Sequence, residues 1–265
     1  MDHNLKTIET FHDYIQYIQT NCNNKLTLFR GQAQDKPLLP RIARLRLKSD
    51  FTATEAIMFK EFQLFSLPYL PIEPKDNWDW LAIAQHHGLA TRLLDWTENP
   101  LVALWFTVER PPLKDKNRKL LDGVLWCFKP QEVHFVTEQD VNPFNIRRTL
   151  VFQPKHITNR ITAQSAWFTV HKYLKTNNSF VKMETNRTYK KYLEKLIIPA
   201  EKFAEFRTTL DKYGINHSTV FPGIDGICKL IAWRNSYLED ELGYLSSNAA
   251  EVAVTTEESD KLIEE

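Results

Sequence analysis

Polar side chains that could bind or transform a charged ligand are concentrated in one short stretch, residues 85–106, with the sequence QHHGLATRLLDWTENPLVALWF. Its first eleven residues include Gln85, His86, His87, Thr91, Arg92 and Asp95, with apolar segments on both sides. Histidine is the natural general base near neutral pH, and a carboxylate partner fixes its tautomer. We therefore take His86, His87 and Asp95 as catalytic candidates. Because adjacent side chains at a helix end point about 100° apart, we expect one of the two histidines to face a cleft and the other to be exposed or capping.

Asp95 also has structural interpretations. It could cap the helix that begins after Thr97, or it could form an ion pair with Arg92 or a histidine. Losing a cap costs about 1 kcal/mol, whereas removing one partner of a buried ion pair costs about 3–5 kcal/mol. We expect the buried pair, so that Asp95→Asn should fold, melt several degrees lower and lose function.

A second group of polar residues lies outside that stretch. In LFRGQ, Arg30 follows an apolar pair, and a guanidinium on a rigid strand suits bidentate binding of phosphate or carboxylate. Gly31 would let a ligand approach the backbone closely. The alternative for this motif is an arginine paired with a structural carboxylate.

We expect these residues to converge on one pocket for an anionic ligand, with Arg30 on the wall opposite residues 85–95. Arginines would bind phosphates, and glutamines would read polar edges of the ligand. The expected ligand-binding residues are Arg30, Gln32, Gln85, Thr91, Arg92, Arg160 and Gln164.

Periodic patterns place the candidates on regular elements. Apolar spacing and capping residues predict helices over about 8–20, 52–67, 76–87, 100–109, 203–213 and 224–234. Thr52 with Glu55 should form a capping box, and Asn99 with Pro100 should begin the fourth helix. Short apolar runs predict strands over 25–32, 124–128, 166–171 and 192–199. The order favours an α+β fold, a single domain with N-terminal helices and a mostly antiparallel sheet.

Composition limits the possible functions. No linker divides the 265 residues, so we expect one domain over residues 1–245 and an acidic, flexible tail over 246–265. With 34 basic and 33 acidic residues, no global field recruits nucleic acid or an anionic membrane. The basic runs 41–48 and 110–119 are local exceptions, either solvated faces or contacts to a nucleic-acid backbone. Signal-peptide, membrane-span and metal-binding patterns are not recognisable, which favours a soluble, cytoplasmic protein without a metal.

The order of four motifs resembles the FRG domain family, named for its Phe-Arg-Gly motif. These motifs are LFRGQ, LLPRIAR, QHHGLATRLLDWTENPLVALWF and RITAQSAWF, and the segment FPGIDGI extends the likeness to about residue 231. The resemblance implies a bacterial or viral conflict system such as anti-phage defence. The arginine–glycine pair after an apolar strand also resembles ADP-ribosyltransferases, in which such an arginine holds NAD. This likeness implies a role in NAD binding for Arg30, with Glu184, Glu194 and Asp225 as further carboxylate candidates.

The leading hypothesis is therefore a protein that binds NAD or another nucleotide and cleaves a glycosidic bond or transfers ADP-ribose to a nucleic-acid or protein target. A metal-independent nuclease is the second hypothesis, with histidine as acid and base and arginines stabilising the phosphate. A non-catalytic recognition module is the third, and it predicts a polar cluster that is fully internal. The sequence leaves the target and the oligomeric state open.

Overall fold

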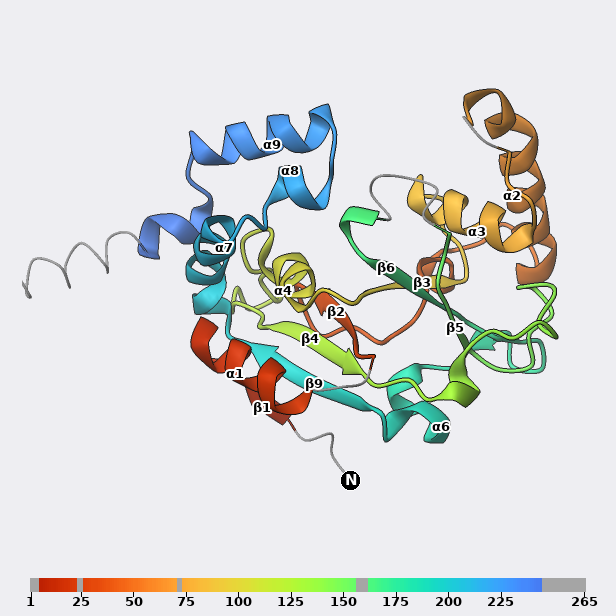
Figure 1. Ribbon diagram of the computed structural model, residues 1–265, viewed down its shortest axis with the longest axis horizontal. Coiled ribbons are helices and arrows are strands. Elements are labelled where there is room, and N and C mark those ends of the chain that lie inside the picture. The colour runs from red at the N-terminus through yellow and green to blue at the C-terminus, as the bar shows by residue number, and fades with distance from the viewer. Residues whose placement is uncertain (1–4, 23–25, 71–72, 156–161, 245–265) are drawn as a thin grey trace, which may run out of the picture.

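The computed structural model describes residues 5–22, 26–70, 73–155 and 162–244. Within these residues the main sheet has seven strands in the order β1-β9-β4-β2-β3-β6-β5 (Figure 1). Neighbouring strands are antiparallel except β1 and β9, which are parallel. The strands are Leu5–Thr7 (β1), Leu28–Gln32 (β2), Leu93–Thr97 (β3), Gly123–Phe128 (β4), Leu150–Phe152 (β5), Ala166–Val170 (β6) and Leu193–Ile198 (β9). A separate pair joins Tyr173–Leu174 (β7) to Ser179–Phe180 (β8).

Most of the helices form two groups, toward opposite ends of the sheet (Figure 1). The helices are Phe11–Asn21 (α1), Phe51–Ser66 (α2), Asn77–His86 (α3), Pro100–Val108 (α4), Arg187–Lys190 (α6), Phe203–Lys212 (α7), His217–Val220 (α8) and Ile224–Arg234 (α9). Short 3-10 turns add Arg41–Arg44 (η1), Leu67–Tyr69 (η2), Glu132–His134 (η3), Met183–Thr185 (η4) and Ala200–Lys202 (η5). In Figure 1, α2 and α3 lie at one end, whereas α1, α4, α7, α8 and α9 gather at the other. None of the helices in the described residues is long and apolar enough to cross a membrane.

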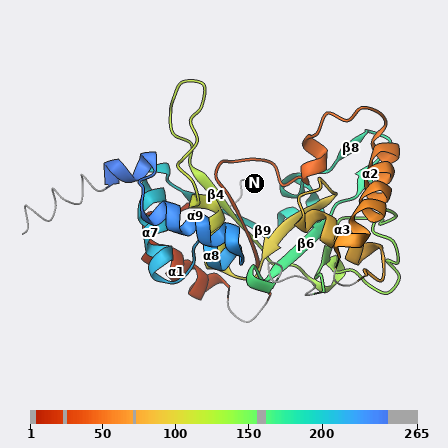
Figure 2. The same cartoon turned by 90° about the horizontal axis from the view of Figure 1, so that it is seen from above.

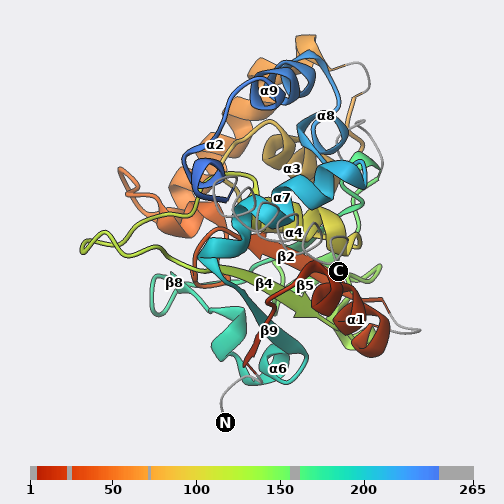
Figure 3. The ribbon, with the colours of Figure 1, turned by 90° about the vertical axis from the view of Figure 1, so that its left-hand side faces the viewer.

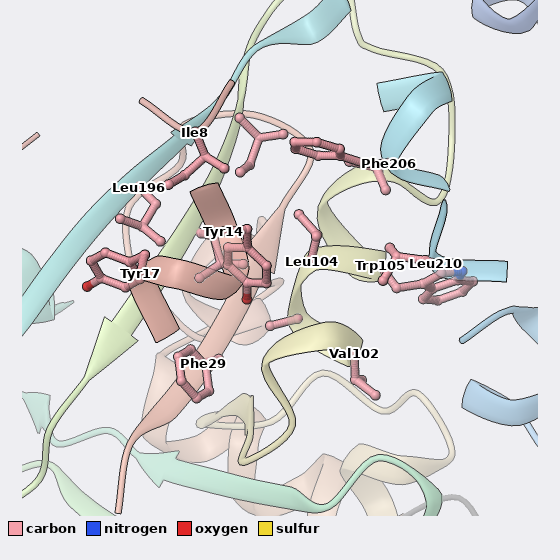
Figure 4. Close-up of a cluster of buried hydrophobic side chains, with 14 of the residues drawn as sticks. Ile8, Tyr14, Tyr17, Phe29, Val102, Leu104, Trp105, Leu196, Phe206 and Leu210 are labelled. Carbon is pink, nitrogen blue, oxygen red and sulfur yellow. The ribbon is translucent and has the colours of Figure 1, made fainter. Parts of the chain in front are cut away.

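The largest apolar core lies where α1, α4 and α7 pack on the sheet (Figure 4). Phe29 contributes to it from β2, Leu104 from α4 and Phe206 from α7, and all three are buried. Asn99 begins α4 because its side chain accepts hydrogen bonds from two backbone amides of the first turn. A nearly all-apolar α4 is thereby fixed against β2, the strand that carries Arg30.

Gly31 is needed for this packing, a role that the sequence did not indicate. A Cβ atom at this position would lie 1.9 Å from the carbonyl oxygen of Ala103 and 2.5 Å from Oγ1 of Thr107. Both residues belong to α4. Since side chains alternate along a strand, the face of β2 that bears Arg30 is the one opposite α4.

The α+β prediction is confirmed, since the six predicted helices and four predicted strands all correspond to observed elements. One central strand was missed, because residues 93–97 form β3 and the sequence patterns predicted no element there. The predicted Thr52–Glu55 capping box is also wrong. Asp50 caps α2, and Glu55 is buried instead, in an ion pair with Arg92. The predicted tail over 246–265 lies outside the described residues.

Candidate functional site

A cavity of about 620 Å³ opens beside β2 and β3. The two strands share a single register pair, Phe29 with Thr97, whereas β2 and β4 share five. Residues 29–32 of β2 and 93–97 of β3 line the cavity, so it lies where this ladder stops. The C-terminal end of α3 and the η1 turn complete its polar walls.

Arg30 bridges the opening between the two strands. Its Nη1 donates a 2.7 Å hydrogen bond to the backbone oxygen of Asp95, and lies 3.7 Å from Oδ2 of the same residue. The guanidinium therefore satisfies a carbonyl that the β2–β3 ladder does not pair. Arg30 and residues of the 85–95 stretch line one cavity, as expected, but Arg30 contacts Asp95 directly and so does not lie on the wall opposite to it.

Gln85 holds the carboxylate of Asp95 from the helix side. Its Nε2 donates to both carboxylate oxygens, at 3.1 Å each. The hydroxyl of Thr91 donates to Oε1 of Gln85 at 2.7 Å and accepts from the amide of Leu93 at 3.0 Å. Because Thr91 occupies the carbonyl end of the amide, the NH₂ end must face Asp95. Thr91 is buried behind the cavity wall, so it orients Gln85 and does not line the cavity.

Two buried polar atoms on β2 lack a hydrogen-bond partner, Nε of Arg30 and Oε1 of Gln32. Both residues line the cavity, and their spacing puts them on one face of the strand. Burial lowers the pKa of Arg30 from its usual value, against the opposing effect of the Asp95 carboxylate. An unpaired buried polar atom costs about 1–3 kcal/mol, and rotation of the terminal amide of glutamine is easy. A ligand that supplies the missing partners would recover this cost.

Positive charge dominates the cavity. Five of its lining residues are cations and two are carboxylates, although the chain as a whole is nearly neutral. The cations are Arg30, Lys36, Arg41, Arg44 and Arg110, and the carboxylates are Asp95 and Glu109. Arg41 donates to the backbone oxygen of Gly88 at 3.0 Å, which ties η1 to the end of α3. Such a wall attracts an anionic ligand.

Both adjacent histidines line the cavity, whereas we expected one to face it and the other to be exposed or capping. His86 is the last residue of α3 and is half-buried, whereas His87 is its C-cap and is exposed. Their rings meet edge to face, with centroids 4.8 Å apart. The chain turns at Gly88, with a φ of 86°, and the cavity extends around this helix end.

Arg92 does not belong to the cavity. It donates to both carboxylate oxygens of Glu55, and both side chains are more than nine-tenths buried. The predicted pair of Arg92 with Asp95 is therefore wrong. Arg92 directly precedes β3 and lies three positions before Asp95, so in extended chain the two side chains point to opposite faces. Asp95 is also no helix cap, since Asn99 fills that position.

The remaining candidates lie in different places. Gln164 lines the cavity, and its Nε2 donates to the backbone oxygen of Val220 at 3.1 Å. Arg160 lies outside the described residues. Glu184, Glu194 and Asp225 are all absent from the cavity wall.

Sequence reasoning missed several residues of this wall. Phe106 and Glu109 belong to the far end of α4 and the residue after it, and Lys36 comes from the loop after β2. Phe106 is half-buried, which leaves part of its ring at the cavity. Its only signal was a position in an apolar helix, which is typical of core residues.

Residues 25–116 match the family described as FRG domain. All but three of the residues that line the cavity fall within this match. No curated protein matches the chain, and no solved structure matches it.

Proposed function

Because the chain carries an FRG domain and that segment builds the cavity, we propose that the protein binds a phosphorylated nucleotide there, with NAD as its substrate. The charge of the wall supports an anionic ligand, because arginine forks bind phosphate oxygens in pairs. A volume of about 620 Å³ also falls within the range of about 300–1,000 Å³ that is typical of small-molecule sites.

The lining residues suit the parts of a dinucleotide. Arg41 and Arg44 on η1 are exposed cations that suit the two phosphates. Phe106 offers a ring on which a base can stack. The unpaired Oε1 of Gln32 suits a donor such as a ribose hydroxyl or an amide NH₂ group.

The observation that carries the reaction is the carboxylate of Asp95, which is exposed inside a cation-lined cavity. Cleavage of the bond between nicotinamide and ribose sends the bonding electron pair to nicotinamide and leaves positive charge on the sugar. A carboxylate stabilises that charge, as in glycoside hydrolysis. Arg30 and Gln85 hold the carboxylate of Asp95 in a fixed orientation. Water or a nucleophile of a target then takes the ADP-ribosyl group.

Binding and reaction can be tested separately. Binding of NAD to the folded state should raise the melting temperature, since a hundredfold excess over Kd stabilises by about 2.7 kcal/mol. Mass spectrometry should detect release of nicotinamide. Asp95→Asn should abolish release and retain the thermal shift, whereas the control Glu98→Gln should behave as wild type. Glu98 is an exposed carboxylate close to Asp95 in sequence but outside the cavity wall. Failure of NAD and of other nucleotides to shift the melting temperature would refute the proposal.

A metal-independent nuclease is the second candidate, and the contact between His86 and His87 at the cavity favours it. Two imidazoles could serve as acid and base on a phosphodiester. This activity would degrade RNA or DNA without NAD and would be lost in His86→Ala or His87→Ala. The non-catalytic module, which requires a fully internal cluster, is disfavoured by the exposure of Asp95.

A role in anti-phage defence remains a proposal that the family resemblance implies. Cells that express the wild-type chain should show fewer phage plaques than cells that express Asp95→Asn. Equal plaque counts would contradict this role and leave the biochemical proposal intact.

A further inference from the structure

Two basic segments border the cavity. The first basic segment, residues 41–48, contributes Arg41 and Arg44 to the cavity wall. The second basic segment, residues 110–119, contributes Arg110 and Leu113. In Figures 2 and 3, the chain around both segments projects toward the same side of the molecule. Both basic segments therefore contribute cations to the cavity wall and extend beyond it.

The two segments hold nine cations and a single acid, in a chain whose net charge is only +1. The cations are Arg41, Arg44, Arg46, Lys48, Arg110, Lys114, Lys116, Arg118 and Lys119, and all are exposed. Arg110 pairs with Glu109, and Lys114 pairs with Glu239. Among the described residues, the other seven form no ion pair.

Contacts with the backbone keep part of this charge in place without neutralising it. Arg41 donates to the carbonyl oxygen of Gly88, and Arg44 donates to those of Pro37 and Leu39. Carbonyl oxygens carry no formal charge, so both guanidiniums keep theirs. The first basic segment is thus held beside the mouth as a fixed positive edge.

From this arrangement we propose that a single-stranded nucleic acid lies across the cavity mouth, with its phosphates on the two basic segments. A concave site bordered by two basic segments suits a flexible strand, whose charged backbone follows positive grooves. The half-buried ring of Phe106 inside the cavity gives one base a stacking surface. This inference does not depend on whether NAD is the substrate, because the basic segments extend beyond the cavity wall.

The test uses four cations of the basic segments that do not line the cavity, Arg46, Lys48, Lys116 and Lys119. The rim variant replaces all four with glutamine. The matched control replaces Lys175, Arg187, Lys191 and Lys212 with glutamine. These four are exposed, lie outside the basic segments and do not line the cavity.

Binding of a labelled single strand of about 20 nucleotides is measured by fluorescence anisotropy from about 50 to 200 mM salt. Wild type and control should bind with a steep salt dependence. The rim variant should bind about tenfold or more weakly, and its log–log salt slope should be smaller by about 3, since each lost phosphate contact on a single strand removes about 0.7. The thermal shift with NAD or AMP should stay unchanged in the rim variant, which separates this proposal from the nucleotide site.

Four outcomes would overturn the inference. One is no binding of single-stranded DNA or RNA at the lowest salt, and another is equal slopes for the rim variant and the control. The third is binding to vesicles of equal parts phosphatidylcholine and phosphatidylserine without binding to either strand, which would identify an anionic membrane as the partner. A DNA strand and an RNA strand of the same sequence show which nucleic acid is preferred, and a duplex that binds more tightly than both would contradict the single-strand geometry.

Discussion

The protein has two arginine–carboxylate pairs near the central strands β2 and β3, and they differ in how far water can reach them. In the pair of Arg92 and Glu55, the side chains are 5% and 8% exposed. In the pair of Arg30 and Asp95, they are 19% and 56% exposed. Both arginines follow or precede apolar strand residues, so the sequence pattern alone does not separate them.

The hydrogen bonds explain the difference. Arg92 donates to both oxygens of Glu55 and to the backbone oxygens of Pro143 and Phe144, and the ring of Phe144 lies 5.0 Å from its guanidinium carbon. Arg30 has one short contact to a carbonyl and a buried Nε without a partner. A saturated pair fixes the packing of α2 against the sheet, whereas an incomplete pair beside a cavity retains capacity for a ligand.

The largest loss of stability is expected when the buried pair of Arg92 and Glu55 is broken. Glu55→Gln leaves the charge of Arg92 buried without a counter-ion, and loss of one partner of such a pair costs about 3–5 kcal/mol. Urea denaturation should show this loss in the free energy of unfolding. The double variant Glu55→Gln, Arg92→Met should recover part of it, because no buried charge remains. A single variant as stable as wild type would mean that the pair is open to water.

His171 is influenced by both arginines, and its titration predicts how stability depends on pH. It is fully buried, and burial, with smaller contributions from Arg30 and Arg92, lowers its pKa from 6.5 to about 3. Below pH 6.5 the unfolded chain binds a proton at this residue, while the folded chain does not until about pH 3. Stability must therefore fall as the pH falls through this window.

For His171, the loss between pH 7 and pH 5 is about 2 kcal/mol. His171→Gln should remove that part of the pH dependence in urea denaturation at the two pH values. The comparison uses the difference between pH values, so a general loss of stability in the variant does not obscure it. An unchanged pH dependence would show that His171 can accept a proton in the folded state.

A smaller effect is expected at Thr91, whose hydroxyl orients Gln85 and through it the carboxylate of Asp95. Thr91→Val keeps the shape of the side chain but removes its hydrogen bonds to Oε1 of Gln85 and from the amide of Leu93, each of which contributes about 0.5–1.5 kcal/mol. The freed amide of Gln85 can then turn, so binding at the cavity should weaken more than stability. Thr91→Ser restores a hydroxyl and should restore binding. Equal binding by all three proteins would exclude the orienting role.

The sequence predicted features that depend on local chemistry. Asn99 begins α4 as expected, and α3 lies within the predicted range 76–87, between its cap Asp76 and the positive φ of Gly88. β3 was missed because it is central in the sheet. Leu94 and its apolar neighbours fill both of its faces, so no alternation marked a strand.

Partners distant in sequence could not be predicted in the same way. Glu55 lies 37 residues before Arg92, and only the packing of α2 on the sheet joins them. The close packing of Gly31 on α4 was missed because α4 begins almost 70 residues later. The convergence of Arg30 with Gln85 and Asp95 was predicted, because polar residues between apolar segments in two short motifs indicated one common site.

The smallest expected change in stability concerns Asp95, and it revises our expectation from the sequence. We expected a buried pair, and hence a melting temperature several degrees lower in Asp95→Asn. The carboxylate is 56% exposed, its oxygen lies 3.7 Å from Arg30, and exposed pairs of this kind contribute about 0–1 kcal/mol. Asparagine can still accept one hydrogen bond from Gln85, so Asp95→Asn should be about as stable as wild type and nevertheless lose activity.

Denaturation with urea measures the stability of Asp95→Asn, and release of nicotinamide from NAD measures its activity. If Asp95→Asn lost about 3 kcal/mol or more, the cleft would be closed in solution and Asp95 would resemble Glu55. If it kept full activity, the incomplete pair would be structural after all, and the two arginines would differ only in exposure.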